Sequence, residues 1–145
     1  MYMRPVLLAT PWRFGYTWLN MYLLLLCLAT KSRNLKAVVW SNSLAILGSY
    51  EYARARFPDS VSPLAKRLQG RDAAAHLAPL VVLFNAPTQK WHAASALVMH
   101  LLWGVYHKFD INTVYKLDKP LHHRDLLEAW TATLLCHTCC IAVAR

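Results

Sequence analysis

YLLLLCLA, Tyr22–Ala29, is apolar on every face that a helix could present, and LVVLF, Leu80–Phe84, has the same character. A helix in a soluble domain of this size needs a polar outer face at helical spacing. Both stretches lack such a face, so they favour lipid over water as the surrounding solvent. They predict helices that cross a membrane.

Charge-free runs recur along the chain. Lys, Arg, Asp and Glu are absent from Trp18–Thr30, Ala37–Tyr50, Ala73–Ala86, Ala93–Tyr106 and Ala129–Ala144. The 145 residues are 57% apolar, a composition that by itself fits a soluble core as well as a bilayer. With their flanks, the runs predict spans at about 16–30, 35–53, 73–87, 91–108 and 125–144. We expect an all-α fold, a polytopic transmembrane helix bundle of about five spans, in a single integral membrane domain, 1–145; a soluble helical bundle is the alternative.

The predicted spans are short, and the longest connection carries helix signals of its own. A perpendicular span needs roughly 20 residues. Charged side chains at the margins, such as Lys36 and Lys108, can reach the headgroups, and thinning of the bilayer costs only fractions of a kcal/mol per Å. A thin internal membrane such as the endoplasmic reticulum therefore fits best. In the connection, Ser62 followed by Pro63 predicts the start of a short interfacial helix.

The net charge of +9 raises the question of nucleic-acid binding. The sixteen basic residues are scattered over every connection, whereas a nucleic-acid interface groups them on one face. The N-terminal tail with the second and fourth connections holds eleven of them. Because Lys and Arg are retained on the cytoplasmic side, this asymmetry predicts a cytoplasmic N-terminus and an odd number of spans. We expect the lipid bilayer, and no nucleic acid, as a partner.

Polar groups at membrane depth are functional candidates because they are expensive there. The alternation of spans brings Thr17, His76 and His107 to the same side of the membrane. A hydroxyl and an imidazole at one depth are the minimum for a nucleophile with its general base. The alternative is a hydroxyl bonded to its own helix and a solvated imidazole. Asn20, one turn from Thr17, is a candidate oxyanion donor or an interhelical hydrogen-bonding residue.

The remaining His and Cys residues do not form a metal-binding pattern. His100 and His107 lie two turns apart on one helix face, too far for one metal without a further element; both are supporting candidates. Cys136–Cys140 reads CHTCC and lacks four ligands at zinc spacing, so soft core packing or palmitoylation is expected there. We expect no metal and no cofactor.

Four short motifs in a fixed order carry a family resemblance. They are Trp12–Asn20 (WRFGYTWLN), His76–Pro79 (HLAP), Val105–His107 (VYH) and Val114–Tyr115 (VY). Over roughly residues 12–117 the chain resembles the androgen-induced-gene family of multi-pass membrane threonine hydrolases and its microbial relatives. The resemblance implies hydrolysis of lipid esters such as fatty acid esters of hydroxy fatty acids. It also implies that Thr17 is the nucleophile and His76 its partner.

Two functions therefore follow from the sequence. The first is an intramembrane lipid ester hydrolase that uses Thr17 and His76 on a lipid ester substrate. The alternative is a non-catalytic small membrane protein that assists or joins a larger membrane complex. A transporter would need a continuous polar path, and Asn85, His100 and His137 are too sparse for one.

Overall fold

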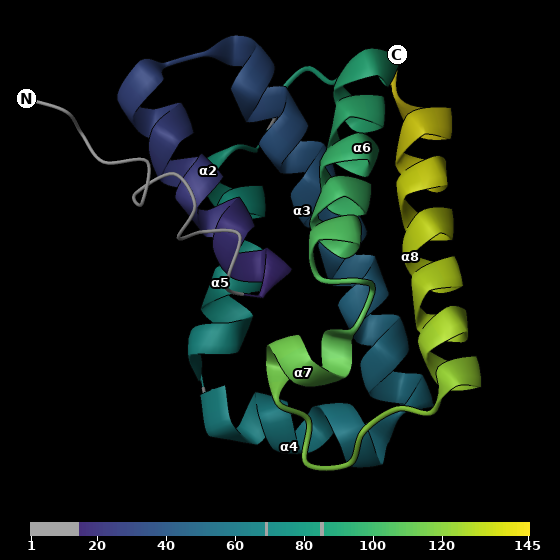
Figure 1. Ribbon diagram of the computed structural model, residues 1–145. Coiled ribbons are helices and arrows are strands. Elements are labelled where there is room, and N and C mark those ends of the chain that lie inside the picture. The colour runs from purple at the N-terminus through teal and green to yellow at the C-terminus, as the bar shows by residue number, and fades with distance from the viewer. Residues whose placement is uncertain (1–14, 69, 85) are drawn as a thin grey trace, which may run out of the picture.

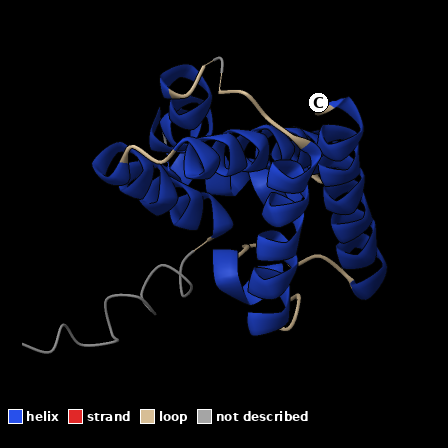
Figure 2. Cartoon of the chain, turned by 90° about the horizontal axis from the view of Figure 1, so that it is seen from above, coloured by secondary structure: helices blue, strands red, loops and turns tan. Residues whose placement is uncertain are grey.

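A computed structural model describes residues 15–68, 70–84 and 86–145, and this part of the chain consists of helices joined by loops, without a strand (Figure 1, Figure 2). The expected all-α class is confirmed. The helices are α2 (Tyr16–Thr30), α3 (Arg33–Arg56), α4 (Pro58–Leu68), α5 (Gly70–Val82), α6 (Lys90–Tyr106), α7 (Ile111–Tyr115) and α8 (His123–Val143).

Helix α3 lies at the centre of the bundle. It packs against α2, α4, α5, α6 and α8, and α6 also packs against α8 (Figure 1). Its buried side chains are mostly small: Ala37, Val39, Ser41, Asn42, Ser43, Ala45 and Ile46. Small side chains let neighbouring helices approach closely. One 24-residue helix can therefore have neighbours on several of its faces.

Successive long helices run in opposite directions. Helices α2, α5 and α8 run toward the upper end of Figure 1, and α3 and α6 run away from it. At the upper end, the backbone N–H of Arg145 donates to the Thr88 carbonyl at 3.2 Å, and the Lys90 N–H donates to the Arg145 carbonyl at 3.1 Å. Helices α4 and α7 lie at the lower end. This alternation is the one that the order of charge-free runs predicts.

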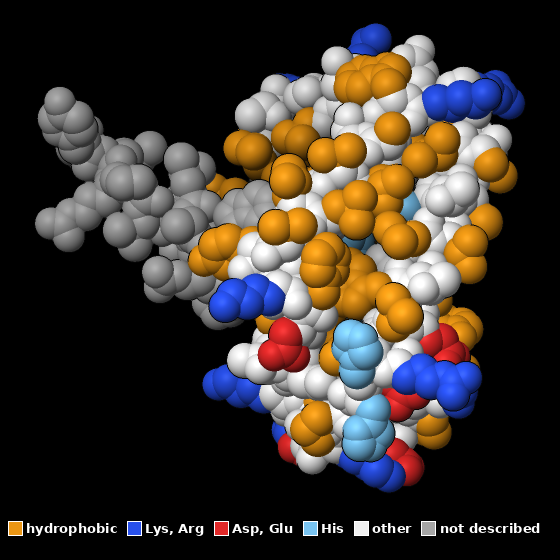
Figure 3. Space-filling model, turned by 45° about the vertical axis from the view of Figure 1, so that its right-hand side comes forward, with side chains coloured by type: hydrophobic (Ala, Val, Ile, Leu, Met, Phe, Trp, Pro, Cys, Tyr) orange, Lys and Arg blue, Asp and Glu red, His pale blue; other side chains and the backbone are white. Residues whose placement is uncertain are grey.

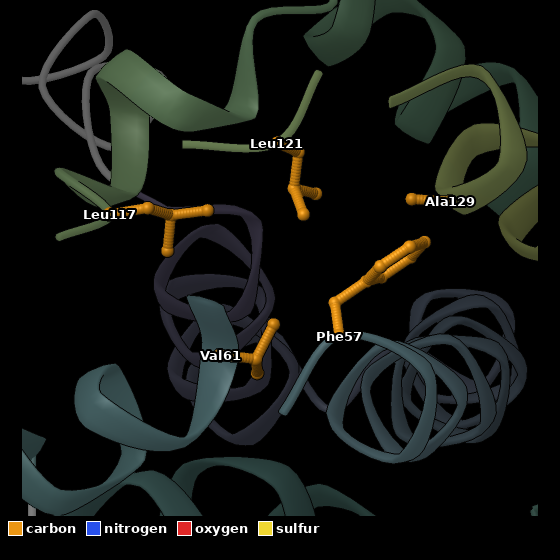
Figure 4. Packing of buried hydrophobic residues seen from close by; sticks show 5 residues of the cluster. All are labelled: Phe57, Val61, Leu117, Leu121 and Ala129. Atoms are coloured by element: carbon orange, nitrogen blue, oxygen red, sulfur yellow. The ribbon is translucent and has the colours of Figure 1, made fainter. Parts of the chain in front are cut away.

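A small apolar cluster closes the lower end. Its buried members come from α3's end, α4, the connection after α7, and α8: Phe57, Val61, Leu117, Leu121 and Ala129 (Figure 4). Asn112 fixes that connection, because its side-chain amide donates to the Leu121 carbonyl at 2.9 Å and its oxygen accepts from the Leu121 N–H at 2.8 Å. The loop before α8 is thus held against the bundle.

Helix bounds agree with the predicted spans to within three residues except at the end of α5, and the helix of the longest connection, α4, begins earlier than predicted. Helix α2 has the bounds expected for the first span, and α6 and α8 lie within two residues of theirs. Helix α5 ends at Val82, short of the predicted 87, and Pro87 disfavours a helical conformation in the residue before it. Helix α4 begins at Pro58, not after Ser62, because a proline costs no hydrogen bond at the first helical position.

Apolar side chains are exposed over much of the surface. Val81, Phe84 and Val143 are 72%, 73% and 76% exposed. One face shows hydrophobic side chains between Lys and Arg at its upper edge and a mixed group of Lys, Arg, Asp, Glu and His at its lower end (Figure 3). Of the described helices, α8 alone has both the length and the apolar composition to cross a membrane; α2 and the 73–82 part of α5 are shorter apolar helices.

We predict that Gly104→Ala destabilises the bundle. A Cβ on this α6 residue would lie 2.6 Å from a ring atom of Phe109 and 2.8 Å from one of Trp130, so rings must move. We expect a loss of about 1–3 kcal/mol in the free energy of unfolding, measured by thermal unfolding in detergent. Gly70→Ala is the control, because its Cβ meets no described atom within 4 Å. Equal stability of the two variants would contradict the packing described for α6.

Candidate functional site

Thr17 and His76, from α2 and α5, lie in contact. The distance from Thr17 Oγ1 to His76 Nε2 is 3.4 Å, and the His76 ring stacks on Tyr50 with 4.3 Å between centroids. The distance is long for a hydrogen bond, as catalytic hydrogen bonds often are before a substrate is present. The structure therefore brings together the two residues that the sequence pairs.

The position of Thr17 follows from where α2 begins. The Gly15 carbonyl accepts the N–H groups of Trp18 at 2.9 Å and Leu19 at 3.3 Å, which places Thr17 in the first helical turn. Tyr115 packs against this start: its hydroxyl accepts the Tyr16 N–H at 3.1 Å. A Cβ on Gly15 would lie 2.5 Å from the Tyr115 ring, so a larger residue would push the two apart.

A cavity of about 460 Å³ opens beside the pair. Thr17, His76 and His100 line it, and most of the remaining lining is apolar, including Ile46, Val61, Leu64, Trp103, Val114 and Trp130. This volume falls in the range of small-molecule sites, roughly 300–1,000 Å³. A hydroxyl and two imidazoles therefore share the wall of an apolar chamber.

The short helix α7 forms part of the wall and is held by its cap. The Asp110 carboxylate accepts from the Thr113 hydroxyl at 2.6 Å and from the Thr113 N–H at 3.3 Å. The hydrogen bond from the Thr113 side chain lowers the pKa of Asp110 below its usual value. The cap is therefore charged at neutral pH and keeps α7 against the start of α2.

Asn20 belongs to a buried hydrogen-bond network between α2 and α3. Its amide nitrogen donates to Ser43 Oγ at 2.6 Å, and its oxygen accepts from Asn42 Nδ2 at 2.7 Å. The Tyr16 hydroxyl donates to Asn42 Oδ1 at 2.8 Å. Asn20 does not line the cavity. Of the two roles expected for Asn20, the geometry gives the interhelical hydrogen bond and not the oxyanion donor.

His100 pairs with a residue that sequence reasoning left unpaired. Its Nδ1 lies 2.9 Å from Nε2 of His137 on α8. The Tyr16 ring stacks on the His100 ring, with 3.6 Å between centroids and 12° between planes. The sequence does place one imidazole in each of two successive charge-free runs. Whether the two rings meet depends on the rotation of each helix about its axis, which the sequence pattern does not give.

His107, the third residue expected at this depth, packs against aromatic rings. It follows the last residue of α6 and contacts the Trp103 and Tyr106 rings at 4.7 and 4.9 Å between centroids. It is not among the cavity-lining residues. Asn85 lies outside the described residues. Within the described residues no three His, Cys, Asp or Glu side chains gather closely enough to hold a metal ion.

Comparison of the chain with protein-family models, with curated proteins and with solved structures gave no match. The geometry of the cavity therefore carries the functional argument.

We predict that Tyr16→Phe costs stability through the network. The substitution keeps the ring against His100 but removes the hydroxyl, which leaves a buried acceptor on Asn42. The loss should be about 1–3 kcal/mol in the free energy of unfolding, measured in detergent. Tyr52→Phe removes an exposed hydroxyl bonded to Glu128 at 2.7 Å and should change stability by less than about 0.5 kcal/mol. Similar losses in both variants would argue against the network.

Proposed function

We propose that the chain is a multi-pass membrane protein in which Thr17 and His76 hydrolyse lipid esters inside the bilayer. The observation that carries the proposal is the contact of 3.4 Å between the Thr17 hydroxyl and the His76 imidazole at the wall of an apolar cavity. Hydrolysis of a lipid ester needs a nucleophile within reach of a base. It also needs an apolar space beside them that can hold the acyl chain.

The distribution of side chains supports the multi-pass part of the proposal. Exposed apolar side chains follow α2, α5, α6 and α8, and charged side chains gather at the upper edge and the lower end of the face in Figure 3. Monomeric soluble proteins rarely expose apolar patches of this kind. Helix α8 is long and apolar enough to cross a membrane. The shorter helices cross with bilayer thinning, which points to a thin internal membrane such as the endoplasmic reticulum.

The reaction follows from the two side chains. His76 Nε2 removes the Thr17 proton while Oγ1 attacks the ester carbonyl carbon. The tetrahedral intermediate collapses, the bond to the alcohol oxygen breaks, and His76 returns the proton to that oxygen. Water, deprotonated by His76, then attacks the carbonyl carbon of the acyl-Thr17 ester. The bond from that carbon to Oγ1 breaks, His76 returns the proton to Oγ1, and the fatty acid is released. The apolar cavity wall holds the acyl chain near Thr17 through these steps.

The substrate class has two supports. Most of the lining beyond the pair is apolar, so a fatty acyl chain gains free energy by leaving water for the cavity. The resemblance to the androgen-induced-gene family independently points to fatty acid esters. The competing function, a non-catalytic role in a larger membrane complex, uses neither the pair nor the cavity.

We predict that Thr17→Ala and His76→Ala abolish hydrolysis of long-chain lipid esters by the purified protein in detergent. Loss of the nucleophile should lower kcat by about 10³-fold or more, and loss of the base by about 10²–10⁴-fold. A fluorophosphonate probe should label the wild type and not Thr17→Ala. Release of fatty acid and probe labelling are the two measurements.

The matched controls for this experiment are Thr131→Ala and His107→Ala. The Thr131 hydroxyl donates to the Leu127 carbonyl at 2.8 Å on the exposed side of α8, and neither residue lines the cavity. Both controls should retain activity. Equal activity of wild type and Thr17→Ala would remove the catalytic proposal and leave the non-catalytic function.

We predict that the chain resists carbonate extraction from microsomal membranes and that its connections alternate sides. A glycosylation acceptor on a flexible spacer should be modified when inserted after Lys31, after Pro87 or at the C-terminus. The same insert in the connection 116–122 should stay unmodified, because that end holds most of the basic residues. Modification at every position, or release of the protein by carbonate, would refute the multi-pass topology.

A further inference from the structure

The reaction above needs a donor for the developing oxyanion, and the residue expected from the sequence does not supply it. The amide nitrogen of Asn20 donates to Ser43, and Asn20 does not line the cavity. His100 does line the cavity. Its Nδ1 faces His137, so Nε2 is the ring nitrogen left for a molecule inside the cavity.

The surroundings of His137 decide which nitrogen of His100 carries the proton. His137 is fully buried, and its Nδ1 has no hydrogen-bond partner among the described residues. If His100 Nδ1 donated to His137 Nε2, a neutral His137 would carry its proton on that unpartnered Nδ1. A buried N–H without an acceptor is rarer than an under-satisfied acceptor. The favoured arrangement is therefore donation from His137 Nε2–H to His100 Nδ1.

The same arrangement leaves His100 with a proton on Nε2. A neutral imidazole carries one N–H and one acceptor nitrogen, and here Nδ1 is the acceptor. We propose that His100 Nε2–H donates a hydrogen bond to the carbonyl oxygen of the lipid ester, and that His137 is a positioning residue that fixes this tautomer. The proposal rests on the proposed ester hydrolysis, in which that oxygen becomes negatively charged.

The His100 ring is also fixed in direction. Its face lies against the Tyr16 ring at 3.6 Å, and the Tyr16 hydroxyl is bonded to Asn42. Tyr16 directly precedes Thr17, so one helical turn orients the nucleophile and the ring of the donor. A donor held in place before the reaction has no reorganisation cost when the charge develops.

The first experiment reads the tautomer without using activity. Long-range ¹H–¹⁵N correlation spectra of the full chain, labelled with ¹⁵N-histidine in detergent micelles at neutral pH, distinguish protonated from unprotonated ring nitrogens. The His100 signals are those lost in His100→Gln. Expected is a protonated Nε2 and an unprotonated Nδ1. The opposite tautomer, or a doubly protonated ring, overturns the proposal.

The second experiment measures kcat and KM for p-nitrophenyl octanoate in micelles. His100→Leu should lower kcat by about 10²–10³-fold, the usual effect of losing one oxyanion donor, with little change in KM. His100→Gln keeps an N–H donor and should recover a large part of kcat. His137→Leu should lower kcat, and His137→Gln, whose amide can still donate to His100 Nδ1, should restore it.

The outcomes separate this inference from the proposed function. If Thr17→Ala and His76→Ala lose activity but His100→Leu retains the wild-type kcat, ester hydrolysis stands and the role of His100 is wrong. That role is also wrong if His100→Gln and His100→Leu are equally impaired although both fold, or if the His137 pair changes KM alone. If Thr17→Ala is fully active, ester hydrolysis fails and the role of His100 fails with it.

Discussion

The buried hydrogen bonds between α2 and α3 are the constraint on which the site depends. Tyr16, Asn20, Asn42 and Ser43 are each almost fully buried and satisfy one another across the two helices. An unpaired amide in such surroundings is costly, and a partly satisfied network is worse than an apolar one. A rotation or a shift of α2 by one residue would break every bond. The network thus fixes the register of α2, and with it the position of Thr17.

The first turn of α2 contacts two neighbouring helices, α5 and α6. Consecutive residues of an α-helix point about 100° apart, so adjacent side chains meet different helices. Thr17 reaches His76 on α5, whereas Tyr16 stacks on His100 of α6. The cavity lies where these elements meet, and α7 covers it through Tyr115. Side chains from distant parts of the sequence therefore converge at one cavity because α2 begins beside both α5 and α6.

The sequence predicted the level at which residues lie along the bundle axis. It did not predict the rotation of each helix about its own axis. Charge-free runs locate α2, α6 and α8 to within about two residues, and their alternation brings Thr17 and His76 to one level. Rotation needs an apolar side and a polar side, and helices that are apolar all round have no such contrast. The contact between His100 and His137 and the inward turn of Asn20 both depend on rotation. For the same reason His107, at the predicted depth, lies outside the cavity.

The position of Thr17 at the start of its helix explains why its hydroxyl reaches an imidazole. Most Ser and Thr hydroxyls in the described helices donate to the carbonyl four residues earlier: Thr30, Ser43, Ser49, Ser95, Thr131, Thr133 and Thr138. Thr17 is the second residue of α2, so no residue of this helix stands four positions before it. The helix itself therefore supplies no carbonyl to the Thr17 hydroxyl at that spacing, and His76 Nε2 lies 3.4 Å from Oγ1. A threonine one turn later would have such a carbonyl within its own helix.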